Sequence, residues 1–382
     1  MVVRVDVAPA LLHWAVERAG WDDYTIDARM PRFHSWVLGE ARPTLKQLER
    51  FANATHTPLG MLFLPAPPHE EVPIPDMRTL GNTAVRRPSP DLLDTIYQCQ
   101  ERQDWYRDYA TENGLEAPRF IGSATTAASI TSVAAQIRQT LNYEVTDRAG
   151  FHETGTAVRK LVDAIEETGV LVMVSGIVGG NTRRTLNPEE FRGFTLADPL
   201  VPLIFVNGGD VKTAQIFTLV HEFAHVWLGG SALSDASMAA QDGVDEEVWC
   251  NRVAAEVLVP RDELREQANA NLADVELDRL ARKFKVSALV VLTSALDAGL
   301  LGWGEYRRRF LERRNLSYPA PRRTSSGGNF YNTHPLRFSR RFIRAVTSST
   351  FEGTTSFRDG YRLLGTRNHN TFVRLAEEVN SA

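Results

Sequence analysis

The residues of this chain with the clearest chemistry are His221, Glu222 and His225, which lie in the apolar run FTLVHEFAHVWLGG. Their spacing follows the pattern H-E-x-x-H. Residues four apart on an α-helix lie on the same face, so the imidazoles of His221 and His225 can bind one metal ion. Glu222 lies about 100° around the helix from His221, where a general base can take a proton from a water on that ion. The pattern predicts a metal-dependent hydrolytic site.

A third ligand must come from another element, because hydrolytic zinc sites have three protein ligands and one open position. A second helical run, VDEEVWCNRVAAEVLVP, follows after a loop and is stopped by Pro260. Its first turn carries Asp245, Glu246 and Glu247, and an antiparallel pair of helices brings one of these carboxylates onto the histidines. The alternative is a pair of core histidines, which leaves Glu222 as a costly unpaired charge in an apolar segment.

Four segments of the chain resemble the ImmA/IrrE family of zinc-dependent endopeptidases. They are FRGFTL (Phe191–Leu196), PLIFVN (Pro202–Asn207), AQIFTLVHEFAHVWLG (Ala214–Gly229) and EVWCNRVAAEVLVP (Glu247–Pro260). The resemblance covers at least residues 150–262. It implies a metalloprotease in which a Glu on the helix after the H-E-x-x-H helix is the third ligand. It also implies Zn²⁺ as the cofactor, with Mn²⁺ as the alternative.

Transferred position by position, the resemblance implies metal ligands at His221, His225 and Glu247, with Glu222 as the catalytic base. It favours Glu247 over Glu246 because the family places its ligand four residues before an Asn, which here is Asn251. Cys250 is predicted to be a small buried apolar residue rather than a ligand, since a carboxylate already fills that role.

The composition is that of an ordinary globular protein with room for two or three domains. The 382 residues are 43% hydrophobic and 24% charged, and the net charge of −4 excludes an overall basic coat for nucleic acid. Two cysteines, Cys99 and Cys250, fit a reducing compartment. With no apolar segment of about 18 residues and no charged-then-apolar leader, we expect a cytoplasmic protein that does not associate with membranes.

An Xre-type helix-turn-helix unit is predicted for residues 1–68. Trp36, Gly39, Pro43 and Thr44 form the pattern W-x-x-G-x-x-x-P-T, followed by LKQLERFANAT, and this resembles Xre-type repressors. The unit holds seven Lys or Arg and seven Asp or Glu, so it lacks the positive footprint that a DNA-docking module normally has. Binding to DNA and docking to another protein both remain hypotheses for it.

Residues 69–122 are predicted to be a proline-rich linker followed by a connecting helix. The linker, PAPPHEEVPIPDMRTLGNTAVRRPSP (Pro65–Pro90), contains repeated prolines, which favour an extended chain. The helix is expected over Pro90–Gly114, and its aromatic residues are expected to pack against the peptidase domain. These residues are Tyr97, Trp105, Tyr106 and Tyr109.

The metallopeptidase domain is predicted for residues 123–262. Helices are expected over 125–141 and 153–168, and short strands at Gly169–Gly176, Phe191–Leu196 and Pro202–Asn207. A small sheet beside the H-E-x-x-H helix would hold an extended substrate at its edge. Arg192 and Asn207 are candidates for stabilising the oxyanion or, equally, for structural roles. The predicted fold class is α+β: mostly helical, with a zincin-like peptidase core flanked by helical modules.

Two helical regions follow the peptidase domain. Residues 263–302 contain a helix-turn-helix-like pattern with its turn at Lys285–Ser287, and the second helix lacks side chains suited to reading bases, so a scaffold role is expected. Residues 303–382 begin with a basic stretch, 307–344, in which an acidic partner, nucleic acid or protein, is one hypothesis and a solvated face the other. Its arginines are Arg307, Arg308, Arg309, Arg313, Arg314, Arg322, Arg323, Arg337, Arg340, Arg341 and Arg344.

Three functions follow as hypotheses. The favoured one is an endopeptidase that cuts a specific cytoplasmic protein, such as a transcriptional repressor, in a stress response or the induction of a mobile element. The second is an antitoxin-like or regulatory binding protein, paired with a toxin, in which proteolysis is secondary. The third is a DNA-binding regulator that uses the N-terminal unit or the arginine-rich stretch.

Overall fold

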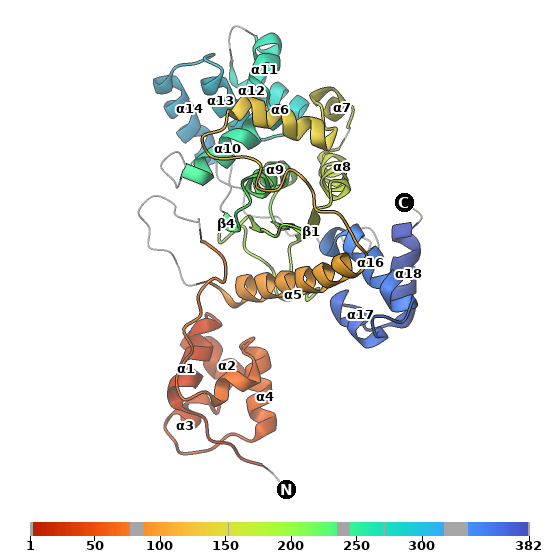
Figure 1. Cartoon of the computed structure of the whole chain (residues 1–382). Coiled ribbons are helices and arrows are strands. Elements are labelled where there is room, and N and C mark those ends of the chain that lie inside the picture. The colour runs from red at the N-terminus through yellow and green to blue at the C-terminus, as the bar shows by residue number, and fades with distance from the viewer. Residues whose placement is uncertain are drawn as a thin grey trace. The chain divides into compact units, whose positions relative to one another are not determined.

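The computed structural model describes residues 3–76, 88–151, 153–234, 245–269, 272–316 and 335–380. The chain divides into two compact units, Met1–Pro73 with Arg86–Ile96, and Ile74–Val85 with Tyr97–Ala382. Most of the described chain is helical, and one mixed sheet of four strands accompanies the helices (Figure 1). The predicted α+β class is confirmed. Within the described residues, no helix has the length and apolar composition needed to cross a bilayer.

The first unit is a small helical module. Its helices are α1 (Pro9–Arg18), α2 (Asp23–Arg29), α3 (Phe33–Val37), α4 (Leu45–Ala54) and the 3₁₀ turn η1 (Leu59–Phe63). Thr44 and Gln47 form a capping box that starts α4, since each side chain accepts from the backbone N–H of the other residue. Leu12, Phe33 and Phe51 lie in its core.

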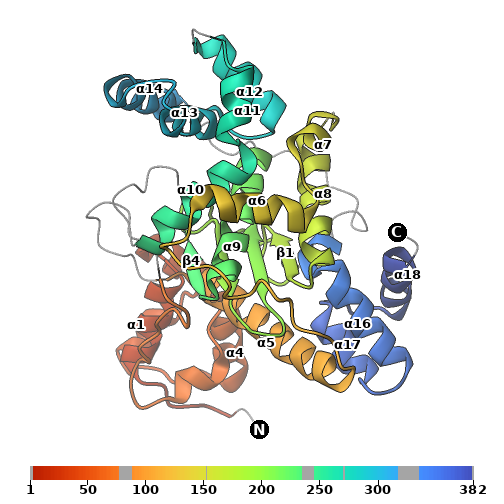
Figure 2. The same ribbon diagram turned by 45° about the horizontal axis from the view of Figure 1, so that its top comes forward.

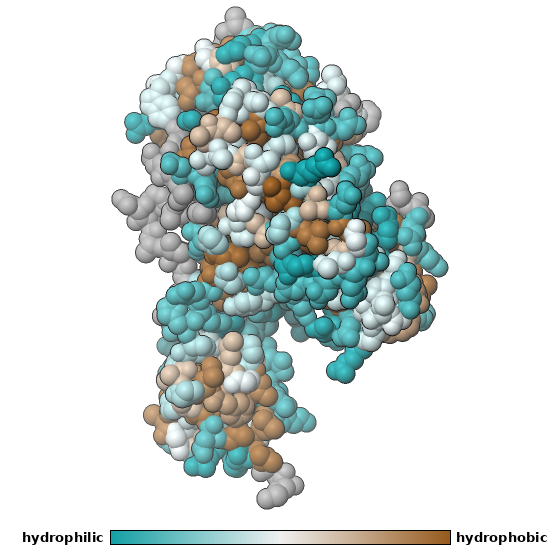
Figure 3. All heavy atoms as spheres, in the orientation of Figure 1, coloured by the Kyte–Doolittle hydropathy of each residue, from teal (hydrophilic) through white to brown (hydrophobic). Residues whose placement is uncertain are grey.

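The surface of this unit is partly apolar. Figure 3 shows brown, hydrophobic atoms grouped on it, and the exposed large side chains include Val3, Tyr24, Leu38 and Phe63. The helix α3, which contains Trp36 of the predicted pattern, has only five residues. DNA binding by the unit stays a prediction.

The second unit is built around the sheet, whose strand order is β1-β3-β2-β4. The strands β1 (Leu171–Ser175), β2 (Gly193–Leu196) and β3 (Leu203–Asn207) lie where the sequence predicts them, while the short edge strand β4 (Ala232–Ser234) was not predicted. β1 pairs with β3 in parallel, and β2 pairs with both β3 and β4 in antiparallel fashion.

Helices cover both faces of the sheet (Figures 1 and 2). One face contacts α9 (Lys212–Leu228), where the Thr195 hydroxyl of β2 donates to the Glu222 carboxylate. The other face lies against α5 (Pro90–Glu112), whose Gln103 donates to the backbone carbonyls of Leu196 and Val201 at 3.0 and 2.8 Å. Because both faces are covered, every residue of the four strands is buried, and the strands read as continuous apolar runs.

The remaining helices pack around this centre. They are α6 (Ile130–Leu141), α7 (Val145–Ala149), α8 (Thr154–Glu167), α10 (Asp245–Leu258), α11 (Arg261–Gln267), α12 (Asp274–Phe284), α13 (Ala288–Asp297) and α14 (Trp303–Leu316). The predicted turn between α12 and α13 forms, with Lys285 in the left-handed region at φ 59° and Ser287 capping α13. The C-terminal segment contains α16 (Arg340–Phe351), α17 (Phe357–Leu363) and α18 (His369–Asn380).

The aromatic residues of α5 pack differently from the prediction. Trp105 and Tyr106 lie against Phe342 of α16, with ring centroids 5.6 and 6.3 Å apart, and Arg341 donates to the Tyr106 hydroxyl. Tyr97 is about half exposed. Trp105 and Tyr106 therefore join α5 to the C-terminal helices, a long-range pairing that helical periodicity cannot reveal.

Candidate metal centre

The predicted H-E-x-x-H helix forms as α9 and is buried on all sides. Residues Gln215 to Trp227 are all buried, as expected for a helix whose apolar residues surround it completely. It ends at Gly229, which adopts a left-handed conformation (φ 77°) and donates its N–H to the carbonyls of His225 and Val226. The helix thus presents His221, Glu222 and His225 inside the protein, where none of them has exposed surface.

Glu247, in the first turn of α10, completes a three-residue cluster. The Nε2 atoms of His221 and His225 lie 3.2 Å apart. Oε2 of Glu247 lies 3.2 Å from the His221 Nε2, and Oε1 lies 3.2 Å from the His225 Nε2. Glu246 does not belong to this cluster.

The cluster fits a zinc-sized ion. In a tetrahedral site with bonds of about 2.0–2.1 Å, neighbouring ligand atoms lie about 3.3 Å apart, close to the separations seen here. Two imidazole nitrogens and a carboxylate are also ligand types that zinc accepts. Without a cation, these lone pairs would converge in a site shielded from water, which is unfavourable unless a proton or a metal ion is shared among them.

Strand β2 holds Glu222 in place. The Thr195 hydroxyl donates to Oε2 of Glu222 at 2.8 Å. Two residues earlier on the same face, Gly193 leaves the space that the carboxylate occupies: a Cβ there would lie 2.8 Å from Oε1 of Glu222 and 2.7 Å from Cγ2 of Thr218. The alternation of side chains along a strand places Gly193 and Thr195 together against α9.

Ser234, at the end of β4, is a further polar residue in the site. Its hydroxyl donates to Oε1 of Glu247 at 3.2 Å and lies 3.4 Å from the His225 Nε2. No pattern in the sequence had pointed to Gly193, Thr195 or Ser234 as residues of the site. The alternation in GFTL could have indicated the first two, once β2 was known to face α9. The three-residue strand that carries Ser234 is too short to give a periodic signal.

Burial and charge act in opposite directions on the two carboxylates. Burial raises the pKa of Glu222 to about 8, against the opposing effects of the His221 charge and the Thr195 hydrogen bond. Burial also acts to raise the pKa of Glu247, but its ion pairs and hydrogen bonds with His221 and His225 hold it well below its usual range. A divalent cation beside Glu222 would favour its ionised form, which is the form that accepts a proton.

The histidines also differ. Burial lowers the pKa of His225. Burial acts in the same direction on His221, but the charge and hydrogen bond of Glu247 outweigh it, so the pKa of His221 is raised. Asn251 acts on the pKa of His221 in the same direction as Glu247. Asn251 lies one turn after Glu247 on α10, so the two residues reach the site from one helix face.

Arg192 and Asn207, the candidates for oxyanion stabilisation, have structural partners. Arg192 lies 3.7 Å from Asp210 in an ion pair. The Asn207 side chain donates to the Phe191 carbonyl at 3.2 Å and accepts from the Gly209 N–H at 3.0 Å. Cys250 is fully buried and free, and it does not belong to the cluster.

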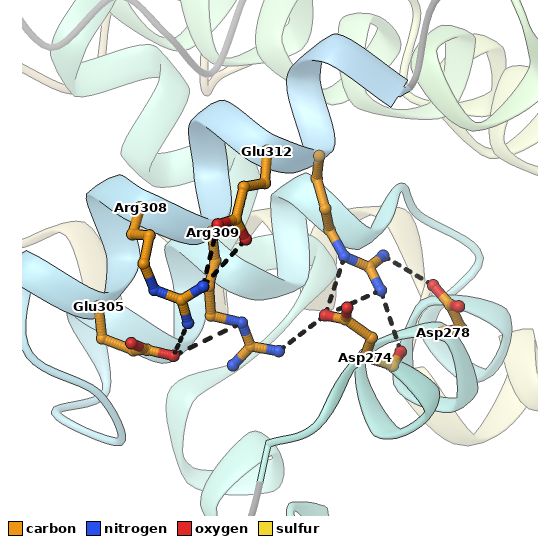
Figure 4. Close-up of polar contacts among 7 residues, drawn as sticks. Asp274, Asp278, Glu305, Arg308, Arg309 and Glu312 are labelled. Atoms are coloured by element: carbon orange, nitrogen blue, oxygen red, sulfur yellow. Dashed lines mark hydrogen bonds and ion pairs between the residues drawn. The ribbon is translucent and has the colours of Figure 1, made fainter.

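Part of the arginine-rich stretch is neutralised within the chain (Figure 4). Arg313 of α14 contacts Asp274 and Asp278 of α12, and Arg309 contacts Asp274. Arg308 pairs with Glu305 and Glu312 of its own helix. Arg309 and Arg313 therefore form ion pairs between α14 and α12, and Arg308 forms ion pairs within α14. Arg322 and Arg323 lie outside the described residues, and a nucleic-acid or acidic partner for the stretch stays a prediction.

Comparisons with known proteins give two family matches. No curated protein matches the chain. Residues 338–378 match a domain of unknown function, DUF8813. Residues 165–294 match the Peptidase_M78 family model, described as an IrrE N-terminal-like domain. The part of the chain that holds the four strands, α9 and α10 therefore matches a peptidase family, in support of the resemblance to ImmA/IrrE proteins.

Proposed function

We propose that this chain is a zinc-dependent endopeptidase. The observation that carries the proposal is the convergence of His221, His225 and Glu247 on one point, with Glu222 beside them and held by β2. When bound, zinc supplies a Lewis acid for the scissile carbonyl and lowers the pKa of water. The match of residues 165–294 to a peptidase family supports the reaction class.

The residues around the proposed zinc site have separate roles in the reaction. Glu222 is placed to take a proton from the attacking water and to pass it to the leaving amine. Thr195 orients the Glu222 carboxylate by donating to one of its oxygens, and Gly193 leaves room for the other. Ser234 fixes the Glu247 carboxylate between the histidines. The burial of the site excludes bulk water, which strengthens each of these electrostatic contacts.

We further propose that the substrate is a specific protein, a transcriptional repressor or regulator, in a cytoplasmic stress-response or toxin–antitoxin setting. This rests on the resemblance to ImmA/IrrE proteins and on the Xre-like pattern of the N-terminal unit. The helical modules on both sides of the peptidase region offer surfaces through which one protein could be selected.

The test compares wild type with Glu222→Gln, each incubated with host lysate in the presence of zinc or of a chelator. Mass spectrometry of new N-termini should find cleavage products with zinc-loaded wild type and none with Glu222→Gln. Glu246→Gln, altered one residue before the proposed ligand Glu247, serves as the matched control and should cleave like wild type. Equal cleavage by Glu222→Gln would refute the proposed base. A partner bound by both proteins and cut by neither would favour the antitoxin-like function.

A further inference from the structure

The outer side of β4 is a sheet edge that borders the candidate metal centre. β4 lies last in the strand order and pairs with β2 through its inner side, where Ser234 lies opposite Gly193. Ser234 contacts the site, as described above. Edge strands carry backbone N–H and C=O groups that can accept one more strand, and extended peptides bind to proteins in this way.

A segment of the chain itself lies on this edge. The Leu233 N–H of β4 donates to the Pro75 carbonyl at 2.9 Å, and Asp76 pairs with Leu233 in the parallel direction. Ile74 is buried, with 8% of its surface exposed, while Pro75 is exposed. These residues come from the stretch that the sequence identifies only as a linker.

The segment has the properties of a bound peptide. One backbone hydrogen bond fixes it to the strand, and one apolar side chain is inserted into the protein next to a residue that faces solvent. Proline at position 75 keeps φ near −65°, which favours an extended chain and lowers the entropy lost on docking. In this arrangement, His221, Glu222 and His225 have no exposed surface.

We propose that the outer edge of β4 is the peptide-binding edge of this site, and that Ile74–Asp76 occupies it as a competing strand. The inference rests on the proposed peptidase function and names its substrate class: an extended peptide with a buried β-branched residue followed by Pro and an acidic residue. Backbone pairing with β4 supplies affinity, and burial of the side chain at the position of Ile74 supplies selection. A substrate displaces the segment before it is cut.

The first test measures binding without catalysis. A fluorescein-labelled peptide with the sequence of residues 70–76 is titrated against the full-length Glu222→Gln protein and against the Glu222→Gln/Ile74→Asp double variant. The added charge expels the internal segment, so the double variant should bind the peptide at least about tenfold more tightly. Glu222→Gln/Glu71→Gln, altered at an exposed residue, is the matched control and should bind like Glu222→Gln. Equal affinity of the peptide for all three proteins would overturn the inference. A peptide with Asp in place of Ile74 that binds as tightly as the original peptide would overturn it as well.

A second measurement guards against misfolding of the double variant. In the milder Ile74→Ala variant, hydrogen exchange of the Leu233 amide should accelerate by about tenfold, since that amide donates to Pro75. Unchanged exchange would also count against the inference.

Failure of the inference and failure of the proposed function give different results. With Glu222 intact and zinc bound, Ile74→Asp should cleave the labelled peptide or a protein substrate several-fold faster than wild type. Enhanced binding without cleavage by any metal-loaded form would refute the peptidase function and leave the peptide-binding edge standing. Zinc-dependent cleavage by wild type with no effect of Ile74→Asp on binding or rate would refute the inference alone.

Discussion

At the scale of single residues, the neighbours Glu246 and Glu247 have very different surroundings although both lie in the first turn of α10. Only the Glu247 carboxylate reaches the two imidazoles, at 3.2 Å from each. A helix turns by about 100° per residue, so the side chains of Glu246 and Glu247 leave α10 in different directions. Which carboxylate joins the two histidines is therefore decided by the rotation of α10 relative to α9.

The first prediction concerns metal binding. Glu247→Gln should lower zinc affinity by more than about a hundredfold, since it removes the only anionic ligand of the proposed set. Loss of a residue that only hydrogen-bonds to a metal ligand already lowers metal affinity by about 10–100-fold. Glu246→Gln should bind zinc like wild type. Bound zinc is measured by elemental analysis after dialysis against graded chelator. Retention of zinc by Glu247→Gln, or its loss from Glu246→Gln, would show that the ligand set is wrong.

The second prediction concerns Gly193. A methyl group there meets Glu222, Thr218 and the Phe205 carbonyl at less than 3.0 Å, so Gly193→Ala should lower the free energy of unfolding by about 1–3 kcal/mol and displace the Glu222 carboxylate. Gly155→Ala is the matched control, because open space surrounds that position in α8. It should be neutral or slightly stabilising. Urea denaturation measures both variants, and an unchanged stability for Gly193→Ala would contradict the close packing.

At the scale of elements, the contact between α12 and α14 shows a use of arginine that composition alone does not reveal. The carboxylates of Asp274 and Asp278 lie on α12 opposite Arg309 and Arg313 of α14 (Figure 4). The pKa of Asp274 is lowered, chiefly by its hydrogen bond with Arg309. The guanidinium groups span two helices and help to fix their packing.

The third prediction follows from these pairs. Replacing Arg309 and Arg313 by Met keeps the apolar stems and removes the charges, so the free energy of unfolding should fall by about 1 kcal/mol at low salt. The difference should shrink at about 1 M salt, where charges are screened within about 3 Å. Arg308→Met, whose partners lie on its own helix, should have a smaller effect. A salt-independent difference in thermal denaturation would show that packing, rather than charge, is responsible.

At the scale of the whole molecule, Glu166 links the sheet and α8 to the C-terminal helices. It is buried, and its carboxylate hydrogen-bonds with the Ser339 side chain and with the backbone of Val172 and Arg340. Burial nevertheless raises its pKa from 4.5 to about 7, and the nearby charge of Asp163 acts in the same direction. Arg340 lies 3.9 Å from Asp163, so it reaches this region from α16.

The fourth prediction is a pH dependence of stability. The folded protein holds a proton on Glu166 that the unfolded chain releases above pH 4.5, so this group's contribution to stability falls as pH rises towards about 7. Glu166→Gln should remove that loss and raise the free energy of unfolding above pH 7 by up to about 3 kcal/mol. Glu167→Gln, at an exposed neighbouring position, is the control and should change little. Urea denaturation at about pH 5 and about pH 8 tests the effect, and parallel pH profiles for wild type and Glu166→Gln would contradict it.

Local signals were sufficient to predict most elements of the fold. The apolar run around His221 predicts α9, and the short runs bounded by Gly, Pro and Asn predict β1, β2 and β3. Each signal depends on neighbours in the chain, through periodicity and through residues that start or end helices. The spacing of His221, Glu222 and His225 likewise places all three on one helix, whatever surrounds it.

The tertiary structure decided the contacts between elements, which residue spacing within one segment cannot predict. The sequence offered Asp245, Glu246 and Glu247 as ligands, and the packing of α10 on α9 brought Glu247 to the histidines. The contacts of Glu222 with β2, the edge position of β4, and the pairing of Leu233 with Pro75 depend on residues far apart in the chain. These contacts form only when the buried faces of different elements meet, so the shape of those faces determines them and local sequence patterns do not.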